Sequence, residues 1–457
     1  MDGRHPDRNA LDSFSRGEIS AAEERWIEDH LRSGCAVCQR EVDALLLRTL
    51  SSAPLGEPAL TANDPGPPVE KDTGWERLVA SLEQRLADVA AERREAPALL
   101  AELLGYAPSA REALLRDASR FQTLAVCELL IEKSYEERFG NPARSVELAE
   151  LGLFLAGQID GERYGRSVAL DLQARAWAYL GNARRVADDL AGAEEALDNA
   201  ERLAESGSAD PLEEARILDL RASLLSDLGR FEQAAELLDE VIDIYDTLRE
   251  THRKGRVMIT KGLFLGYAGW PDEAIRTIRR GLGIIDWELD PRLLLMARHN
   301  LAWFLVDCGR SDEALQQLHR FRHTYFAFND AWTELRLGWL SARIAAGLNR
   351  CEEAEETFQD VRRRFLAEGY AFDAALVTLD LANLYLRDER RAEVKRLASE
   401  MLTFFVSKDF HLHAQAALDV LRQAVELDRA TPRLIQEITS YLRRARRNPG
   451  LRFRPAS

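Results

Sequence analysis

The sequence predicts an all-α protein whose main part is an α-solenoid, a stack of antiparallel helix pairs. Three observations support this fold class: a turn signal recurs at a fixed interval, small residues flank each turn at fixed distances, and larger apolar residues follow them. A fixed period of this size is typical of stacked helix pairs and not of one closed core. The turn positions follow a 40-residue period and are Gly229, Gly269, Gly309, Asn349 and Glu389.

Each turn lies between two small or short apolar residues, seven positions before it and five positions after it. Such residues let two antiparallel helices cross closely, because the distance between helix axes depends on the side chains at the contact. A sixth copy upstream has Gly181 and Ala193 around Asp188. The residues before the other turns are Ala222, Gly262, Ala302, Ala342 and Ala382, and those after them are Ala234, Ala274, Ala314, Ala354 and Val394. The larger apolar residues that pack over each crossing are Leu197, Leu238, Ile278, Leu318 and Phe358, with Ala398 in the last copy.

The first clear copy resembles the tetratricopeptide repeat, in Trp177, Leu180, Gly181, Ala193, Leu197 and Ala200. In that family the first helices of successive pairs line a concave groove that usually holds a peptide or a partner's helix. The resemblance, which covers about half of the chain, therefore implies protein partners. The 40-residue period is longer than the usual 34-residue one, which implies longer helices or longer loops. A helical array of the HEAT or armadillo type is the alternative.

The bulk properties limit the class of protein. A chain of 457 residues is too long for one core and is expected to hold two or three units. Its net charge of −16 argues against general nucleic-acid binding. We find no hydrophobic run of the roughly 18 residues that a membrane helix needs, and no signal peptide, so we expect no membrane segment. Five cysteines without a paired framework indicate a reduced, cytoplasmic protein.

Composition divides the chain into five parts. They are a small module at 1–50, a Pro- and Gly-rich linker at 51–74, a helical N-terminal cap of the solenoid at 75–160, the repeats at 161–402, and C-terminal cap helices with a basic tail at 403–457. Within the N-terminal cap we expect short helices separated at Pro97 and Pro108. A helix pair should follow around the turn at Asn141 and Pro142, without the small residues of the other pairs.

The C-terminal part ends in a cationic segment. The last cap helix should place Leu434, Ile438, Tyr441 and Leu442 on one face. The tail at 441–457 is either an arm for an acidic partner or RNA, or a solvated end whose cations suit a helix C-terminus. We favour the solvated end. The tail contains no acid and six arginines, Arg443, Arg444, Arg446, Arg447, Arg452 and Arg454.

Residues 1–50 contain a pattern of metal ligands. Ser20 followed by Glu23 is a capping box, so a helix should begin near residue 21 and carry His30. Cys35 and Cys38 follow, and two thiols with an imidazole one turn upstream can occupy three corners of a tetrahedral Zn²⁺ site. A structural site needs a fourth ligand, for which the sequence offers His5 or, further away, Cys127. A reactive dithiol without metal, or two ordinary cysteines, are the alternatives.

The same segment resembles the zinc-binding anti-sigma domain of bacteria. Members begin with a His-Pro-Asp-like ligand segment and end in a His-Leu and Cys-x-x-Cys pattern. The resemblance implies that His5, His30, Cys35 and Cys38 are the four ligands of a structural Zn²⁺, although four residues and not three separate His30 from Cys35. It also implies a sigma factor as partner, whose contact with polymerase such domains block. Four protein ligands leave no open position for water, so the metal would hold the fold and catalyse nothing.

We find no motif for catalysis. The phosphate-binding glycine loop, the nucleophile elbow and the paired-histidine zinc protease motif are all missing. His319 and His323 are four residues apart but lack a third ligand, so we interpret them as solvated or packed side chains. Aromatic residues concentrate between 300 and 340, either as a patch for partners or, as we favour, as the core between repeats. An enzyme is therefore not expected.

Two functions fit these patterns. In the first, the protein is a cytoplasmic regulator whose zinc module binds a sigma factor, and whose repeats bind protein or peptide partners. In the second, it is a scaffold or adaptor whose zinc module is purely a structural docking unit. Neither requires direct contact with nucleic acid or a membrane.

Chelation of zinc is expected to unfold residues 1–50 and to leave the repeats folded. So short a segment buries little apolar surface, so that metal-binding free energy becomes folding free energy. Limited proteolysis with and without a chelator measures this difference. Unchanged protection of the N-terminal segment would contradict the zinc site.

Overall fold

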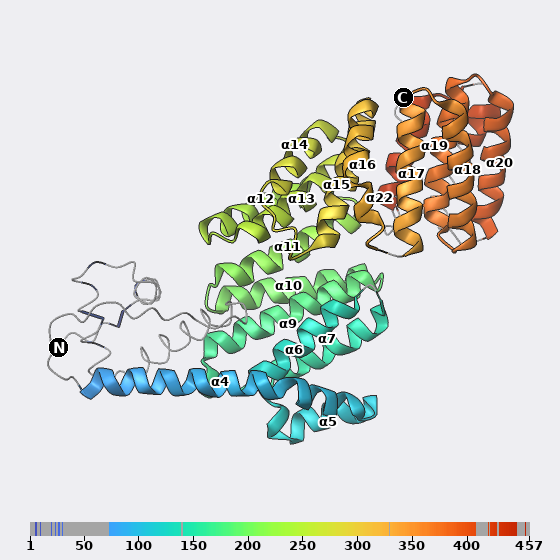
Figure 1. Cartoon of the computed structure of the whole chain (residues 1–457). Helices are drawn as coiled ribbons and strands as arrows, with labels where there is room; N and C mark the ends of the chain where they lie inside the picture. Colours follow the sequence, from blue (N-terminus) through green and yellow to red (C-terminus); the bar gives the residue numbers. More distant parts are fainter. Residues whose placement is uncertain are drawn as a thin grey trace. The chain divides into compact units, whose positions relative to one another are not determined.

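The computed structural model describes residues 5, 6, 10, 20, 23, 26, 27 and 30, then 73–407 except 139 and 329, and then 419, 421–426, 429–445 and 453. All secondary structure among these residues is helical, as the sequence predicts (Figure 1). The chain forms two compact units, Met1–Leu220 and Arg221–Ser457, whose boundary falls inside helix α11 (Pro211–Asp227). Nearly all of the predicted linker lies outside the described residues.

The first unit contains one long helix and two packed helix pairs. Its elements are α4 (Thr73–Gly105), α5 (Pro108–Asp117), η1 (Ser119–Phe121), α6 (Leu124–Glu137), α7 (Pro142–Ala156), α8 (Gly161–Tyr164), α9 (Arg166–Val186), α10 (Leu190–Ser206) and the first part of α11. The expected break at Pro97 is wrong, since α4 continues through this proline. Packing explains the continuity: Ala96, Leu100 and Leu103 are buried in the core of the unit, which offsets the hydrogen bond that a proline removes.

The pair α6 and α7 does have small residues at its crossing, contrary to our expectation. A Cβ atom at Gly152 would lie 3.3 Å from Cγ1 of Ile131. The hydroxyls of Ser134 and Ser145 each donate to the other residue's carbonyl oxygen at 2.8 Å. The sequence period does not reveal this pair, because its turn at Asn141 is out of step with the later turns, which begin at Asp188.

The second unit shows the predicted 40-residue period directly. It contains α12 (Phe231–Thr247), α13 (Thr251–Ala268), α14 (Pro271–Leu282), α15 (Pro291–Asp307), α16 (Ser311–Tyr325), α17 (Ala331–Gly347), α18 (Cys351–Ala367), α19 (Ala371–Arg387), α20 (Arg391–Ser407) and α22 (Pro432–Ala445). From α17 to α20 every helix has 17 residues and every turn has three, which fills the period. In these copies longer helices account for the difference from the 34-residue repeat, whereas α14 has only 12 residues and a longer connection leads to α15.

The predicted turn positions are left-handed C-caps. The residues Asp188, Gly229, Gly269, Gly309, Asn349 and Glu389 all have positive φ. At Gly229 the amide donates to the Ser226 carbonyl at 3.0 Å, and the next amide, of Arg230, donates to the Leu225 carbonyl at 2.8 Å. These two bonds define a Schellman motif, which satisfies the last carbonyls of the helix and reverses the chain.

The predicted small residues lie at the helix crossings. A Cβ atom at Gly262 of α13 would lie only 2.5 Å from Cγ1 of Ile278 and 3.1 Å from the carbonyl oxygen of Ala274 on α14. The equivalent Cβ at Gly181 would lie 2.9 Å from Cγ of Leu197. The small residues and the larger residues that cover them are buried in every copy, so these sequence predictions are confirmed.

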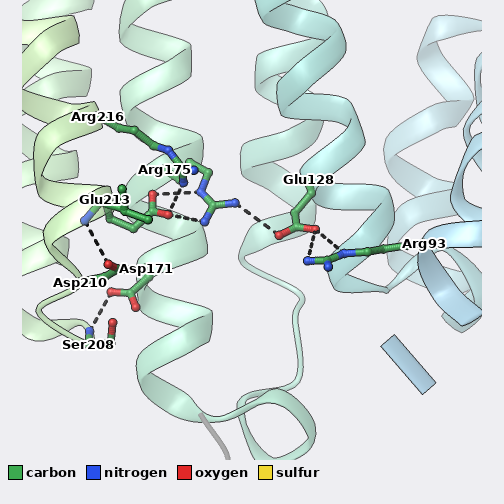
Figure 2. A network of polar contacts seen from close by, with 9 residues as sticks. Arg93, Glu128, Asp171, Arg175, Ser208, Asp210, Glu213 and Arg216 are labelled. Atoms are coloured by element: carbon green, nitrogen blue, oxygen red, sulfur yellow. Dashed lines mark hydrogen bonds and ion pairs between the residues drawn. The ribbon is translucent and has the colours of Figure 1, made fainter. Parts of the chain in front are cut away.

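Ion pairs join four helices of the first unit (Figure 2). Arg175 of α9 contacts Glu128 of α6 at 3.3 Å and forms two bonds with Glu213 of α11, one of them at 3.0 Å. Arg93 of α4 pairs with the same Glu128 at 3.2 Å. Burial by itself would raise the pKa of Glu213, but Arg175 and Arg216 outweigh it and lower this pKa. Glu213 therefore stays ionised although it is buried.

A second buried carboxylate fixes the turn between α10 and α11. Oδ1 of Asp171 accepts a hydrogen bond from the amide of Ser208 at 2.7 Å, next to Ala209 in the left-handed region. Burial raises the pKa of Asp171 to about 6. The first unit thus depends on polar contacts between residues far apart in the sequence.

Replacing Arg175 by Met is expected to destabilise the first unit by about 3 kcal/mol or more, because Glu213 and Glu128 then lose their shared cation in a buried place. The double variant Arg175→Met with Glu213→Leu should recover much of this loss, since no buried carboxylate is left at position 213. Urea denaturation of both variants measures the difference. Equal destabilisation by the single and double variants would contradict this account.

Candidate functional site

The second unit contains a groove along the first helices of its pairs. The larger of two neighbouring cavities has a volume of about 470 Å³ and is lined by residues of α13, α15, α17 and α19 near their C-terminal ends. The smaller cavity has a volume of about 240 Å³. Tyr267 and Arg443 line both cavities. The resemblance to tetratricopeptide repeats implied a groove on these first helices.

Helix α22 forms a second wall of this groove. It packs against α19, and Ile435, Ile438, Tyr441 and Leu442 are buried. The predicted apolar face thus includes Ile435, while Leu434 is only half-buried. An adjoining stripe of α22, which shares Ile435 with the apolar face, lines the larger cavity. It consists of Pro432, Ile435, Gln436, Thr439, Ser440 and Arg443. We expected a helix that closes the end of the stack; α22 also lines its groove.

Trp303 forms part of the wall of the smaller cavity. Its ring centroid is 4.9 Å from that of Trp339, in an edge-to-face contact, and both side chains are buried. Both rings also line the smaller cavity, together with Phe231, Tyr267, Phe304 and Phe372. The aromatic concentration between 300 and 340 is therefore largely core, as we favoured, but its buried tryptophans also form the wall of a cavity.

Three guanidinium groups surround the Trp303 ring. Their Cζ atoms lie at 4.1 Å for Arg343, 5.1 Å for Arg336 and 5.6 Å for Arg443 from the ring centroid. Arg343 pairs with Asp307 at 2.6 Å and with Asp380 at 3.4 Å. Arg443 also lies 6.0 Å from the Tyr267 centroid, so the solvated-tail interpretation does not hold for this residue. The side chains of the other five tail arginines lie outside the described residues.

A neutral histidine holds Arg336 in place. Nη2 of Arg336 lies 2.9 Å from Nε2 of His299, and Nδ1 of His299 lies 2.6 Å from the Tyr325 hydroxyl. A guanidinium only donates, so Nε2 accepts and Nδ1 carries the proton. Burial, followed by the charges of Arg336 and Arg343, lowers the pKa of His299 well below its usual range. At this contact Arg336 is therefore held by a neutral imidazole and not by a carboxylate that would neutralise its charge.

Hydrogen-bond donors, acceptors and ring faces gather here, which is the chemistry of a binding site. Asn300 lines the smaller cavity, and Asn383 and Arg387 line the larger one. The sequence analysis did not identify Arg336, Arg343 or Asn383. A signal was present, because Trp303 and Arg343 occupy the same place in successive 40-residue repeats, directly after Ala302 and Ala342. Residues in such positions lie side by side on neighbouring first helices.

The predicted metal ligands are described in part. The rings of His5 and His30 lie together, with centroids 5.2 Å apart in an edge-to-face contact. The amide of Glu23 donates to Oγ of Ser20 at 3.4 Å, which confirms the predicted helix cap, and Ile27 is buried. Cys35 and Cys38 lie outside the described residues. The zinc site thus stays a prediction.

The other histidine pair lies on the surface of α16. His319 and His323 are both exposed on α16. Within the part of the chain that the structure describes, we find no group of three residues suited to hold a metal ion. Among the described helices, none combines the length and the apolar character needed to cross a bilayer.

Comparison with known proteins supports the fold. The family model "Tetratricopeptide repeat" matches residues 215–247, which span one helix pair, most of α11 and all of α12. The tetratricopeptide-like character that the sequence predicted is confirmed at this pair. No curated protein sequence matches the chain.

Several solved structures are similar in fold. A Rap protein complexed with Competence and Sporulation Factor has a TM-score of 0.53 at 12% identity, over 68% of this chain and 85% of that one. Aspartyl phosphate phosphatase F from Bacillus subtilis has a TM-score of 0.49 at 12% identity, over 90% and 96%. A signal-transduction ATPase with a tetratricopeptide repeat sensor from Pyrococcus horikoshii has a TM-score of 0.45 at 14% identity, over 94% and 71%. At these identities the likeness concerns the fold alone.

Replacing His299 by Gln is expected to weaken the pH dependence of stability between pH 6.5 and 5. The folded pKa of His299 is lowered, so its contribution is fully present above the unfolded value near 6.5 and is lost as the pH falls. The loss is at most about 1.4 kcal/mol for each pH unit, the limit for one proton. Urea unfolding at pH 7.5 and 5.0 measures it, with His319→Gln as the exposed control. An unchanged slope in His299→Gln would contradict the neutral buried imidazole.

Proposed function

We propose that this protein is a non-catalytic adaptor that binds a segment of a partner protein in the groove of residues 221–457. The observation that carries the proposal is the groove itself, a cavity with aromatic and arginine side chains on one wall and α22 on the other. Aromatic residues and arginines are the side chains that most often dominate the energy of protein interfaces. The fold likeness to a Rap protein solved with Competence and Sporulation Factor is an analogy in the same direction.

The N-terminal segment suggests a second role. We propose that residues 1–50 form a zinc-organised docking module for a regulatory partner, with His5, His30, Cys35 and Cys38 as ligands. The contact between the His5 and His30 rings supports the proposal. A sigma factor is the partner that the anti-sigma resemblance implies, and a scaffold role is the alternative. Recovery of a sigma factor with the full chain from its native host separates the two roles.

The groove is tested with the full chain as bait in a lysate of the native host. Replacing Tyr267 by Ala should weaken capture of the partner at least about tenfold, because this half-buried ring lines both cavities. The matched control is Phe326→Ala, which removes a ring that is 73% exposed and lies outside both cavities. Quantitative mass spectrometry compares the captured proteins. Equal capture by both variants would show that partners bind elsewhere.

A further inference from the structure

Two guanidinium groups in the smaller cavity have no carboxylate beside them. Arg336 of α17 and Arg443 of α22 both line this cavity of about 240 Å³. Among the described residues, Arg336 forms a hydrogen bond only with the neutral His299, and Arg443 forms neither a hydrogen bond nor an ion pair. A charge that is taken out of water without an opposite charge is costly, so an anion is the ligand that these groups favour.

The unpaired nitrogens of both arginines are accessible to a ligand. Nε and Nη1 of Arg336, and all three nitrogens of Arg443, donate to no acceptor among the described residues. None of these atoms is closed off from solvent, in contrast to Nη1 of Arg343 on α17. Both side chains are half-buried and line the cavity, so a molecule in the cavity can accept hydrogen bonds from them.

A buried asparagine adds an uncharged donor to the same wall. Asn300 of α15 lines the cavity, and the residue is only 8% exposed. Its side-chain amide forms no hydrogen bond among the described residues, yet neither its nitrogen nor its oxygen is closed off from solvent. Because buried amides nearly always have a hydrogen-bond partner, this amide is suited to bond a ligand in the cavity.

The surroundings of Arg336 do not fully compensate its charge, although two carboxylates also line the cavity, those of Asp227 and Asp373. Burial lowers the pKa of Arg336, and the charge of Asp373 offsets this lowering only in part, while the charge of Arg443 adds to it. A cation with a lowered pKa lies where positive charge is disfavoured. A bound anion would therefore stabilise Arg336 beyond what Asp373 already provides.

The remaining lining favours an aromatic ligand of small size. Tyr267 and Phe372 are only half-buried, so their rings offer surface against which a planar ring can pack. Pockets for drug-sized ligands measure about 300–1,000 Å³, so this cavity suits a smaller molecule, a ring with a short acidic arm. The aromatic residues of the lining are Phe231, Tyr267, Trp303, Phe304, Trp339 and Phe372.

We propose that the smaller cavity binds a small aromatic carboxylate, with its carboxylate held by Arg336, Arg443 and Asn300 and its ring packed against Tyr267. A carboxylate accepts hydrogen bonds from both guanidinium groups and from the asparagine NH₂ group. This ligand goes beyond the proposed function, because it is a free small molecule and not a segment of a partner protein. Tyr267 and Arg443 also line the larger cavity, so the bound acid fixes two side chains of the groove.

Isothermal titration calorimetry of the full chain with phenylacetate, 3-phenylpropanoate and indole-3-acetate tests the site. At least one acid should bind with a Kd below about 1 mM. Its primary amide has the same ring without the charge and should bind at least about tenfold more weakly. Failure of all three acids to bind, or equal binding of an acid and its amide, would overturn the inference.

Substitution of the two arginines assigns the contact. Arg443→Met and Arg336→Met should each bring the tenfold preference for the acid close to equal binding, because each removes positive charge and keeps a long apolar side chain. Arg443→Met loses no hydrogen bond among the described residues, so urea denaturation should show a folded chain even if Arg336→Met is destabilised. Arg322→Met, at an exposed arginine of α16 outside both cavities, is the matched control and should keep the preference.

A preference for the acid that survives in a folded Arg443→Met chain and in Arg336→Met would also overturn the inference, since the anion would then bind elsewhere. Loss of the preference in Arg322→Met would do the same, because the effect would then reflect net charge and not this cavity. These measurements involve no partner protein, so their failure leaves the proposed function to its own test.

Discussion

The close crossing of antiparallel helices at a small residue is the contact on which the second unit depends. At Gly262 there is no room for even a methyl group between α13 and α14. The left-handed turn seven residues later, at Gly269, returns the chain at the angle that this approach needs. Because the same geometry recurs in successive repeats, each first helix is placed beside the next in the same register.

This register decides what the groove contains. It places Arg343 of α17 over the ring of Trp303 of α15, one repeat away in the sequence. It also brings Asp307 and Asp380 from the helices on either side to the same guanidinium. If the first helices were buried on all sides, these positions would need only apolar residues. The polar and aromatic side chains of the first helices therefore indicate a surface for binding.

The first unit is held by a different principle. The ion pairs through Glu128, Arg175 and Glu213 connect the repeat helices α9 and α11 with α6, whose pair is out of step with the repeat period. Helix α4 continues through Pro97 because packing of its C-terminal half outweighs the local cost of a proline. Such contacts are specific to one place in the chain, so they leave no periodic signal.

The sequence by itself determined the helix pairs from α9 to α20, their turns and their crossings. These features depend on residues close together in the chain. Even the left-handed turn at Glu389, where no glycine is present, follows from the 40-residue period. The zinc site predicted from His5, His30, Cys35 and Cys38 stays a prediction, because Cys35 and Cys38 lie outside the described residues. Only the tertiary structure decided that α22 lies along the groove and that His299 supports Arg336. The physical reason is that these contacts join residues from separate helices, whose meeting depends on the packing of the whole unit and not on any local pattern.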